Sequence, residues 1–112
     1  MDSEVKTWLY DILQSIDEIE SYYISKPKLF KDYVADIKTK RAIGRNLEII
    51  GEAVNRILKR DFDFQLENAT KIVGTRNRII HGYDNISDEL IWSIVINHLP
   101  KLRKEVLMLL NG

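Results

Sequence analysis

Apolar residues recur every three or four positions along most of this 112-residue chain, and this spacing constrains the fold more than any other feature. Such spacing places the apolar side chains on one face of an α-helix. Alternating apolar and polar runs bounded by turn residues, which are typical of strands, do not occur. The sequence therefore predicts an all-α fold.

The first half of the chain contains two predicted helical segments. The first runs from an N-cap at Ser3 to about Tyr23. The second runs roughly from Phe30 to Leu58, and the part before Ile43 is weak in apolar residues and could form a separate short helix. The first segment carries Val5, Trp8, Leu9, Ile12, Ile16 and Ile19 on its apolar face, and the second carries Ile43, Leu47, Ile50, Val54 and Ile57.

Two further helices are predicted in the second half. The third covers roughly residues 69–81 and ends at Gly82, because glycine is favoured just after a helix. The fourth opens at Ser87, and Pro100 should kink it because proline removes a backbone hydrogen bond. We expect an up-and-down bundle of four main helices, in which residues 1–112 form a single domain.

Composition excludes several kinds of site. The chain has no cysteine, which rules out disulfides, thiol nucleophiles and zinc sites built on cysteine. Its N-terminus lacks the basic start and apolar run of a signal peptide, and no window approaches the roughly 18 apolar residues of a membrane span. A cytoplasmic location is the default expectation.

The zero net charge conceals an uneven distribution along the chain. Met1–Ile24 carries about −5, whereas Asp36–Arg60 carries about +4. Lys71–Tyr83 adds three bases and no acid. The basic segments could form a face that contacts phosphates, or the acidic and basic helices could simply pair with each other.

Gly44 and Gly51 lie seven residues apart, on nearly the same side of the second helix. Because glycine weakens a helix, this pair suggests that another backbone approaches closely there. The alternative is that one of the two is merely tolerated.

Arg76 interrupts the apolar face of the third helix. On a helical wheel with Ile72 at zero, Arg76 falls near about 40°, within the apolar arc. An unpaired guanidinium there would be costly to desolvate, so Arg76 must face an acid, a cleft or an interface. Arg78 falls near about 240° and is expected to face solvent.

His81 does not share the face of Arg76. Asn77 and His81 are neighbours four residues apart, whereas Arg76 and His81 differ by about 140° and about 7.5 Å of rise. They converge only if the helix unwinds at Gly82 or if two copies of the helix face each other across a dimer axis. A composite site is therefore favoured over an intrahelical pair.

These residues suit metal-independent chemistry on phosphates. His81 in a last helical turn could act as a general acid or base near neutral pH. Arg76 could stabilise the negative charge of a phosphoryl transition state, and Asn77 could support either His81 or the substrate. No carboxylate cluster surrounds them, so no metal or other cofactor is expected. The plainer alternative is a partly buried Arg76 ion pair and a helix-terminal histidine.

The string "RNRIIHGY", Arg76 to Tyr83, resembles the R-x4-H-x-Y signature of HEPN-domain proteins, specifically the HepT-like ribonuclease toxins of prokaryotic toxin–antitoxin pairs. "RNLEIIGEAVNRI" and "ISDELIWSIVINHLPKL" are similar to the second core helix and the last helix of that family. The resemblance covers nearly the whole chain, and the signature shows no departure.

The resemblance implies an all-helical homodimer whose two signatures line a shared cleft. It implies a metal-independent endoribonuclease that acts on RNA, with Arg76 and His81 as catalytic residues and Asn77 in support. It further implies a type VII-like toxin whose cognate antitoxin, a minimal nucleotidyltransferase, neutralises it by adding AMP to Tyr83. Two alternatives remain: a non-catalytic helical partner or substrate-presenting subunit of a nucleotidyltransferase, and a plain dimeric bundle.

Overall fold

The computed structural model describes residues 1–61, 63–69, 72–74 and 87–112. Its helices are α1 (Ser3–Ser21), α2 (Phe30–Ala35), α3 (Ile37–Arg60), α5 (Asp88–Ser93), the π-helical turn η1 (Ile94–His98) and α6 (Leu99–Asn111). No strand occurs among these residues. The predicted all-α class is confirmed. That residues 1–112 form one domain and that the protein is a homodimer both stay predictions.

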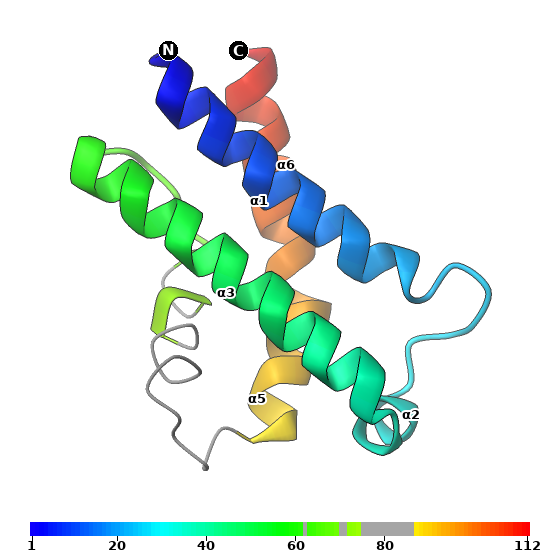
Figure 1. The fold of residues 1–112 in the computed structure, drawn as a ribbon. Coiled ribbons are helices and arrows are strands. Elements are labelled where there is room, and N and C mark those ends of the chain that lie inside the picture. Colours follow the sequence, from blue (N-terminus) through cyan, green and yellow to red (C-terminus); the bar gives the residue numbers. More distant parts are fainter. Residues whose placement is uncertain (62, 70–71, 75–86) are drawn as a thin grey trace.

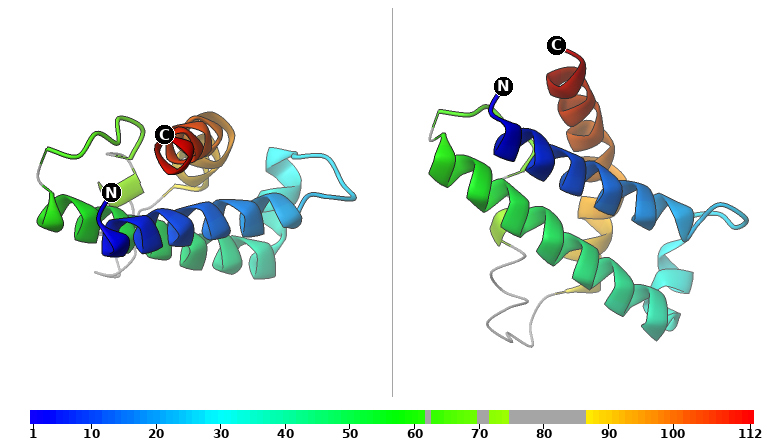
Figure 2. Two further views of the ribbon diagram at one scale, coloured as in Figure 1. Left: turned by 90° about the horizontal axis from the view of Figure 1, so that it is seen from above. Right: turned by 45° about the horizontal axis from the view of Figure 1, so that its top comes forward.

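The described helices form two layers. α1 and α3 lie side by side along much of their length, and α5, η1 and α6 continue as one rod that crosses behind them (Figure 1). Seen from above, this rod lies against one side of the α1–α3 pair (Figure 2). The short α2 lies at the end of α3, beside α5 (Figure 1).

The predicted apolar faces meet in one core between these layers. Its largest fully buried side chains are Leu9, Ile12, Ile16, Ile19, Ile43, Leu47, Ile50, Ile57, Ile72, Ile94, Leu99 and Leu102. Each large side chain of this kind contributes about 1.5–3 kcal/mol when it is removed from water. The hydrophobic effect therefore accounts for the 3–4 spacing read from the sequence.

Two helix boundaries differ from the predictions. The N-cap of α1 is Asp2, not Ser3, because the Asp2 carboxylate accepts a hydrogen bond from the Glu4 N–H at 2.8 Å. The second segment divides at Asp36 rather than near Ile43. Asp36 has an extended backbone, and its carboxylate accepts the Thr39 N–H at 3.1 Å and the Thr39 hydroxyl at 2.7 Å. It therefore starts α3 afresh.

An aromatic cluster explains why α2 folds although it is only six residues long. The Tyr33 ring stacks on Trp92 of α5 with centroids 5.1 Å apart, and Tyr23 meets Trp92 edge-on at 5.9 Å. Phe30 lies 6.4 Å from both Tyr33 and Trp92. Aromatic pairs at such distances add to the area that they bury. Tertiary packing, rather than helix propensity, therefore holds α2.

The last helix is interrupted just before Pro100. Over Ile94–His98 the turn widens, and the Leu99 N–H donates to the Ile94 carbonyl five residues back. Proline has no N–H and clashes with the carbonyl four residues before it, so a regular α-helix cannot pass through this point unchanged. The predicted disturbance at Pro100 takes the form of this π turn.

No described helix is both long enough and apolar enough to cross a membrane.

Candidate functional site

The four predicted site residues, Arg76, Asn77, His81 and Tyr83, lie outside the described residues, as does the predicted helix end at Gly82. Their arrangement on a helix, and a composite site shared by two chains, stay predictions. The structure does describe the chain on both sides of this signature, and it shows what holds each side in place.

On the N-terminal side, the loop that follows α3 is attached to α6. The Glu105 carboxylate accepts the Glu67 N–H at 2.9 Å, and both the Asn68 N–H and the Asn68 side-chain amide at 3.4 Å. Charged acceptors form stronger hydrogen bonds than neutral ones. One carboxylate of α6 thus fixes the loop shortly before the signature.

The chain then enters the core. Ala69 and Ile72 are buried, at 2% and 0% exposure, and the Val73 N–H donates to the Ala69 carbonyl at 3.0 Å. Residues 72–74 are helical, in agreement with the start predicted for the third helix. The burial of Ile72 places the chain against the core four residues before Arg76.

On the C-terminal side, the chain is fixed to α5 and α3. The Ser87 hydroxyl accepts the Leu90 N–H at 3.0 Å and caps α5, as predicted for the fourth helix. Asp88 forms an ion pair with Lys40 of α3 at 3.0 Å, and both side chains are about one-third exposed. The residues that follow the signature are therefore held by α5, whose first residue is tied to the N-terminal part of α3.

Two neighbouring grooves run along α3. One, of about 340 Å³, lies between α1 and α3 and is lined by Trp8, Ile49 and Arg56, among others. The second, of about 370 Å³, lies between α3, α2 and the start of α5. Arg45 and Glu48 line both, so the two grooves adjoin at these side chains.

The ion pairs of α3 bear out one of the two charge patterns left open by the sequence, the pairing of basic with acidic side chains. At its C-terminal end, Arg60 pairs with the acidic start of α1, at 2.9 Å to Asp2 and 3.3 Å to Glu4. Within the grooves, Arg45 pairs with Glu48 at 3.3 Å, and Arg56 pairs with Glu52 at 3.1 Å. Helix pairing thus accounts for part of the basic segment.

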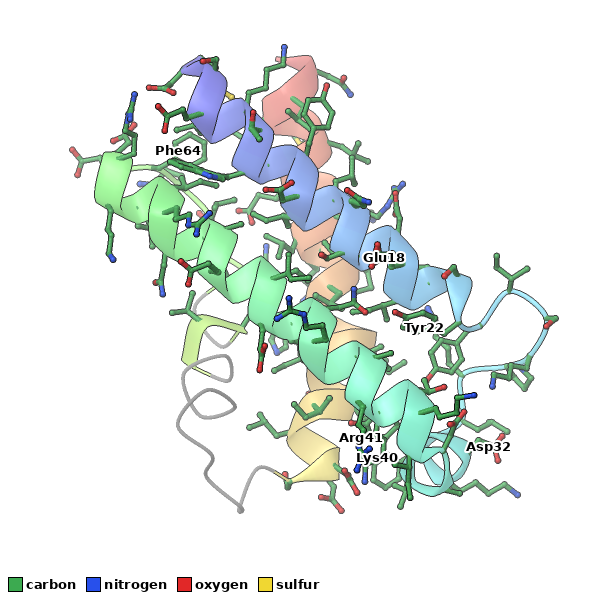
Figure 3. The ribbon with its side chains drawn as sticks, in the orientation of Figure 1. Glu18, Tyr22, Asp32, Lys40, Arg41 and Phe64 are labelled. Carbon is green, nitrogen blue, oxygen red and sulfur yellow. The ribbon has the colours of Figure 1, made fainter. Side chains whose placement is uncertain are left out.

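Arg41 is the basic side chain of the second groove that has no acidic partner among the described residues. It lines the groove, is exposed, and forms no ion pair with any described residue. Arg41 and its neighbour Lys40 project from α3 near α2 (Figure 3). The sequence indicated a basic segment but did not single out Arg41, because its importance depends on which neighbours carry acids.

Tyr33 lines the same groove and was also missed. It is 3% exposed, and burial raises the pKa of its phenol, with a further contribution from the negative charge of Asp88. The phenol therefore stays protonated and can donate a hydrogen bond over the physiological pH range. Its place in a short, non-periodic helix hid it from sequence reasoning.

Metal-ligating side chains do not gather in the described part of the molecule. No group of three or more His, Asp or Glu side chains there could hold a metal ion.

Comparison with known proteins gives a family. The model of the family described as "Ribonuclease HepT-like" matches residues 12–109. A protein of Methanocaldococcus jannaschii named "Putative RNase MJ1380" is 37% identical over 105 residues, which cover 92% of this chain and 94% of that protein. The "Probable ribonuclease HepT" of Thermococcus cleftensis is 31% identical over 102 residues, which cover 88% of each.

A further relative is twice as long. The Methanocaldococcus jannaschii protein named "Gamma-glutamylcyclotransferase and putative RNase MJ0434" is 31% identical over 113 residues, which cover 99% of this chain but only 50% of that protein. No solved structure matches the chain.

Proposed function

The chain belongs to the HepT-like ribonuclease family, and we propose that it is a metal-independent endoribonuclease that acts as the toxin of a type VII-like toxin–antitoxin pair. One observation carries this proposal. A chain that matches the family over residues 12–109 keeps the complete string Arg76-Asn77-x3-His81-x-Tyr83. Family membership makes RNA the expected substrate class.

The proposed reaction uses the 2′-hydroxyl of the RNA itself. That oxygen attacks the neighbouring phosphorus while the bond to the 5′-oxygen of the next nucleotide breaks. The 2′-hydroxyl loses one proton and the departing 5′-oxygen gains one; His81 carries out one of these two transfers and water the other, while Arg76 stabilises the additional negative charge at phosphorus. The products are a 2′,3′-cyclic phosphate and a free 5′-hydroxyl, and no bond-making step requires a metal ion.

Helix geometry supports a site shared by two chains. On an ideal helix Arg76 and His81 point about 140° apart, so one straight helix cannot present both to one phosphate. A homodimer in which two signatures face each other would bring Arg76 of one chain to His81 of the other.

Antitoxin control is proposed to act at Tyr83. Transfer of AMP from ATP to its phenol oxygen, with release of pyrophosphate, would place a negative charge and a nucleotide next to the catalytic residues and so repel RNA. Co-expression with a minimal nucleotidyltransferase followed by peptide mass spectrometry is the direct test. A Tyr83 peptide without AMP-sized additions would count against this part of the proposal.

Cleavage of a broad RNA pool in the presence of EDTA tests the proposed activity. The wild-type protein should cleave, and His81→Ala and Arg76→Ala should each lower the rate by about 10²- to 10⁴-fold while the protein stays folded. Arg78→Ala is the matched control, because Arg78 is expected to face solvent and should leave the rate unchanged. An RNA pool left intact by the wild type, with a stable complex formed with a nucleotidyltransferase, would favour a non-catalytic partner instead.

A further inference from the structure

The groove between α3, α2 and α5 contains an unusual set of side chains for a surface depression. We call it the α3 groove; it is lined by Tyr33, Lys40, Arg41, Gly44, Arg45, Glu48, Asp88 and Ile91. Its volume is about 370 Å³. It combines two guanidinium groups, a buried phenol and an uncovered glycine.

One positive charge of the groove has no acidic partner among the described residues and another is weakly paired, so both can meet a ligand. Lys40 is held by Asp88, at 3.0 and 3.2 Å to its two carboxylate oxygens. Arg41 forms no ion pair within the described part of the chain. The Arg45 side chain is 73% exposed, and such exposed pairs as its contact with Glu48 are weak, so Arg45 can turn to another anion. Residues 41 and 45 are neighbours on one helix face, where two guanidiniums can grip one phosphate.

Gly44 leaves open space between these two arginines. A Cβ atom built at Gly44 would meet no heavy atom within 4 Å. The packing of the described residues therefore gives no reason for glycine at this position, although glycine weakens the middle of a helix relative to alanine. The backbone approach predicted from Gly44 is not made by any described segment, and the space beside Gly44 is open among the described residues.

Tyr33 supplies a neutral donor at the buried side of the groove. Tyr33 is 3% exposed as a residue, and its hydroxyl forms no hydrogen bond with a described residue. The buried side-chain atom that lacks a partner among the described residues is the Tyr23 hydroxyl, so the Tyr33 hydroxyl is not a buried orphan. An anion held by Arg41 would give this phenol an acceptor.

We propose that the α3 groove binds a backbone phosphate of the RNA substrate, a few nucleotides from the one that is cleaved. This inference rests on the proposed function and extends it. The short stretch of chain between the signature and the groove supports this position of the phosphate site. Asp88 lines the groove and lies five residues after Tyr83 and seven after His81. At about 3.6 Å per residue, these residues lie within about 18 Å and 25 Å of Asp88.

Binding of a fluorescein-labelled oligoribonucleotide tests the groove, measured by anisotropy on the His81→Ala protein so that the probe is not cleaved. Arg41→Gln should raise Kd about 3- to 10-fold and reduce the slope of log Kd against log salt by about 0.7 for each phosphate that is no longer neutralised. Arg60→Gln is the matched control, because it removes an arginine at the other end of the same helix, about 28 Å away. Equal effects of the two substitutions would overturn the proposal.

Gly44 gives a second test in which stability and binding move in opposite directions. Gly44→Ala should raise the urea midpoint, because alanine favours the helix, and should still raise Kd for the oligoribonucleotide. Gly44→Leu should raise Kd further. An unchanged Kd in both variants would overturn the proposal. A shift from dimer to monomer in sedimentation would also overturn it, by assigning the groove to a second copy of the chain.

Cleavage kinetics separate this inference from the proposed function. In the otherwise wild-type enzyme, Arg41→Gln should raise KM and leave kcat unchanged, as expected for a group that positions RNA away from the reacting bond. If the wild type cleaves RNA and Arg41→Gln has the same KM, the groove assignment alone fails. If the wild type cleaves nothing but binds RNA in an Arg41-dependent way, the catalytic proposal alone fails.

Discussion

Asn46 is a buried polar residue of α3 at its contact with α1. It is 3% exposed within an apolar surface, and its amide has a partner on each side. Its oxygen accepts the Tyr22 hydroxyl at 2.7 Å, and its nitrogen donates to the Glu18 carboxylate at 2.8 Å. Glu18 of α1 and Tyr22, the residue that caps its C-terminal end, lie on the side of α3 (Figure 3). This arrangement fixes the relative position of the two helices.

Replacing Asn46 with aspartate should lower the free energy of unfolding by about 1–3 kcal/mol at neutral pH, since two carboxylates would then face each other. The double variant Glu18→Gln/Asn46→Asp should recover most of this loss, because glutamine can donate to the new carboxylate. Urea denaturation of both proteins measures the difference. A double variant no more stable than Asn46→Asp would show that the contact does not depend on this hydrogen bond.

Sequence reasoning could have found Asn46, because it lies three residues after Ile43 and four before Ile50 on the apolar face. The same signal, a polar residue on an apolar arc, singled out Arg76. The sequence could not identify the partners, since Glu18 and Tyr22 lie 28 and 24 residues away. Whether such a residue is a structural anchor or part of a site depends on what the fold places opposite it.

At the scale of elements, periodicity predicted α1, α3 and the α5–α6 rod because each buries a regular stripe. It allowed a separate short helix before Ile43 but did not place the break at Asp36, because that position depends on tertiary contacts with Trp92 and on one capping carboxylate. The π turn was missed for a related reason. Proline signals that a helix is disturbed but does not specify how the backbone adjusts.

Asp36 should make stability depend on pH in acid. The Thr39 hydroxyl, the Thr39 N–H and the charge of Lys26 lower the pKa of Asp36 below its ordinary value of 3.8. Its stabilising effect is therefore fully present above about pH 4 and is lost as the pH falls through the lowered pKa. Asp36→Asn keeps a capping side chain but cannot titrate. The difference in urea midpoint between wild type and Asp36→Asn should thus be constant from about pH 5 to 7 and shrink below about pH 4.

Glu105 connects an element of the core to the loop that precedes the signature. Glu105→Ala removes the acceptor for three donors of Glu67 and Asn68 and should lower the free energy of unfolding by about 1–2 kcal/mol. Hydrogen exchange at the amides of Glu67 and Asn68 should accelerate, whereas Arg103→Ala, which removes an exposed ion pair with Asp17, should leave these amides protected. Unchanged exchange in Glu105→Ala would show that other contacts hold the loop.

At the scale of the whole molecule, a site shared between two chains predicts recovery of activity in mixtures. Arg76→Ala and His81→Ala subunits, each inactive alone, should form a mixed dimer with one complete site. Random assortment makes half of the dimers mixed, so activity should return to about one quarter of the wild-type value. A mixture as inactive as its components would place both residues of each site within one chain.

The two chain ends lie close together at one end of the bundle, far from the end where α5 begins (Figures 1 and 2). Arg60 helps to hold the first of them through Asp2 and Glu4. A domain fused to either terminus would therefore lie at the same end of the bundle, and so would a domain into which this bundle is inserted. Either arrangement would leave the α3 groove uncovered. Fluorophores or surface tethers for the experiments above are thus best attached at the termini.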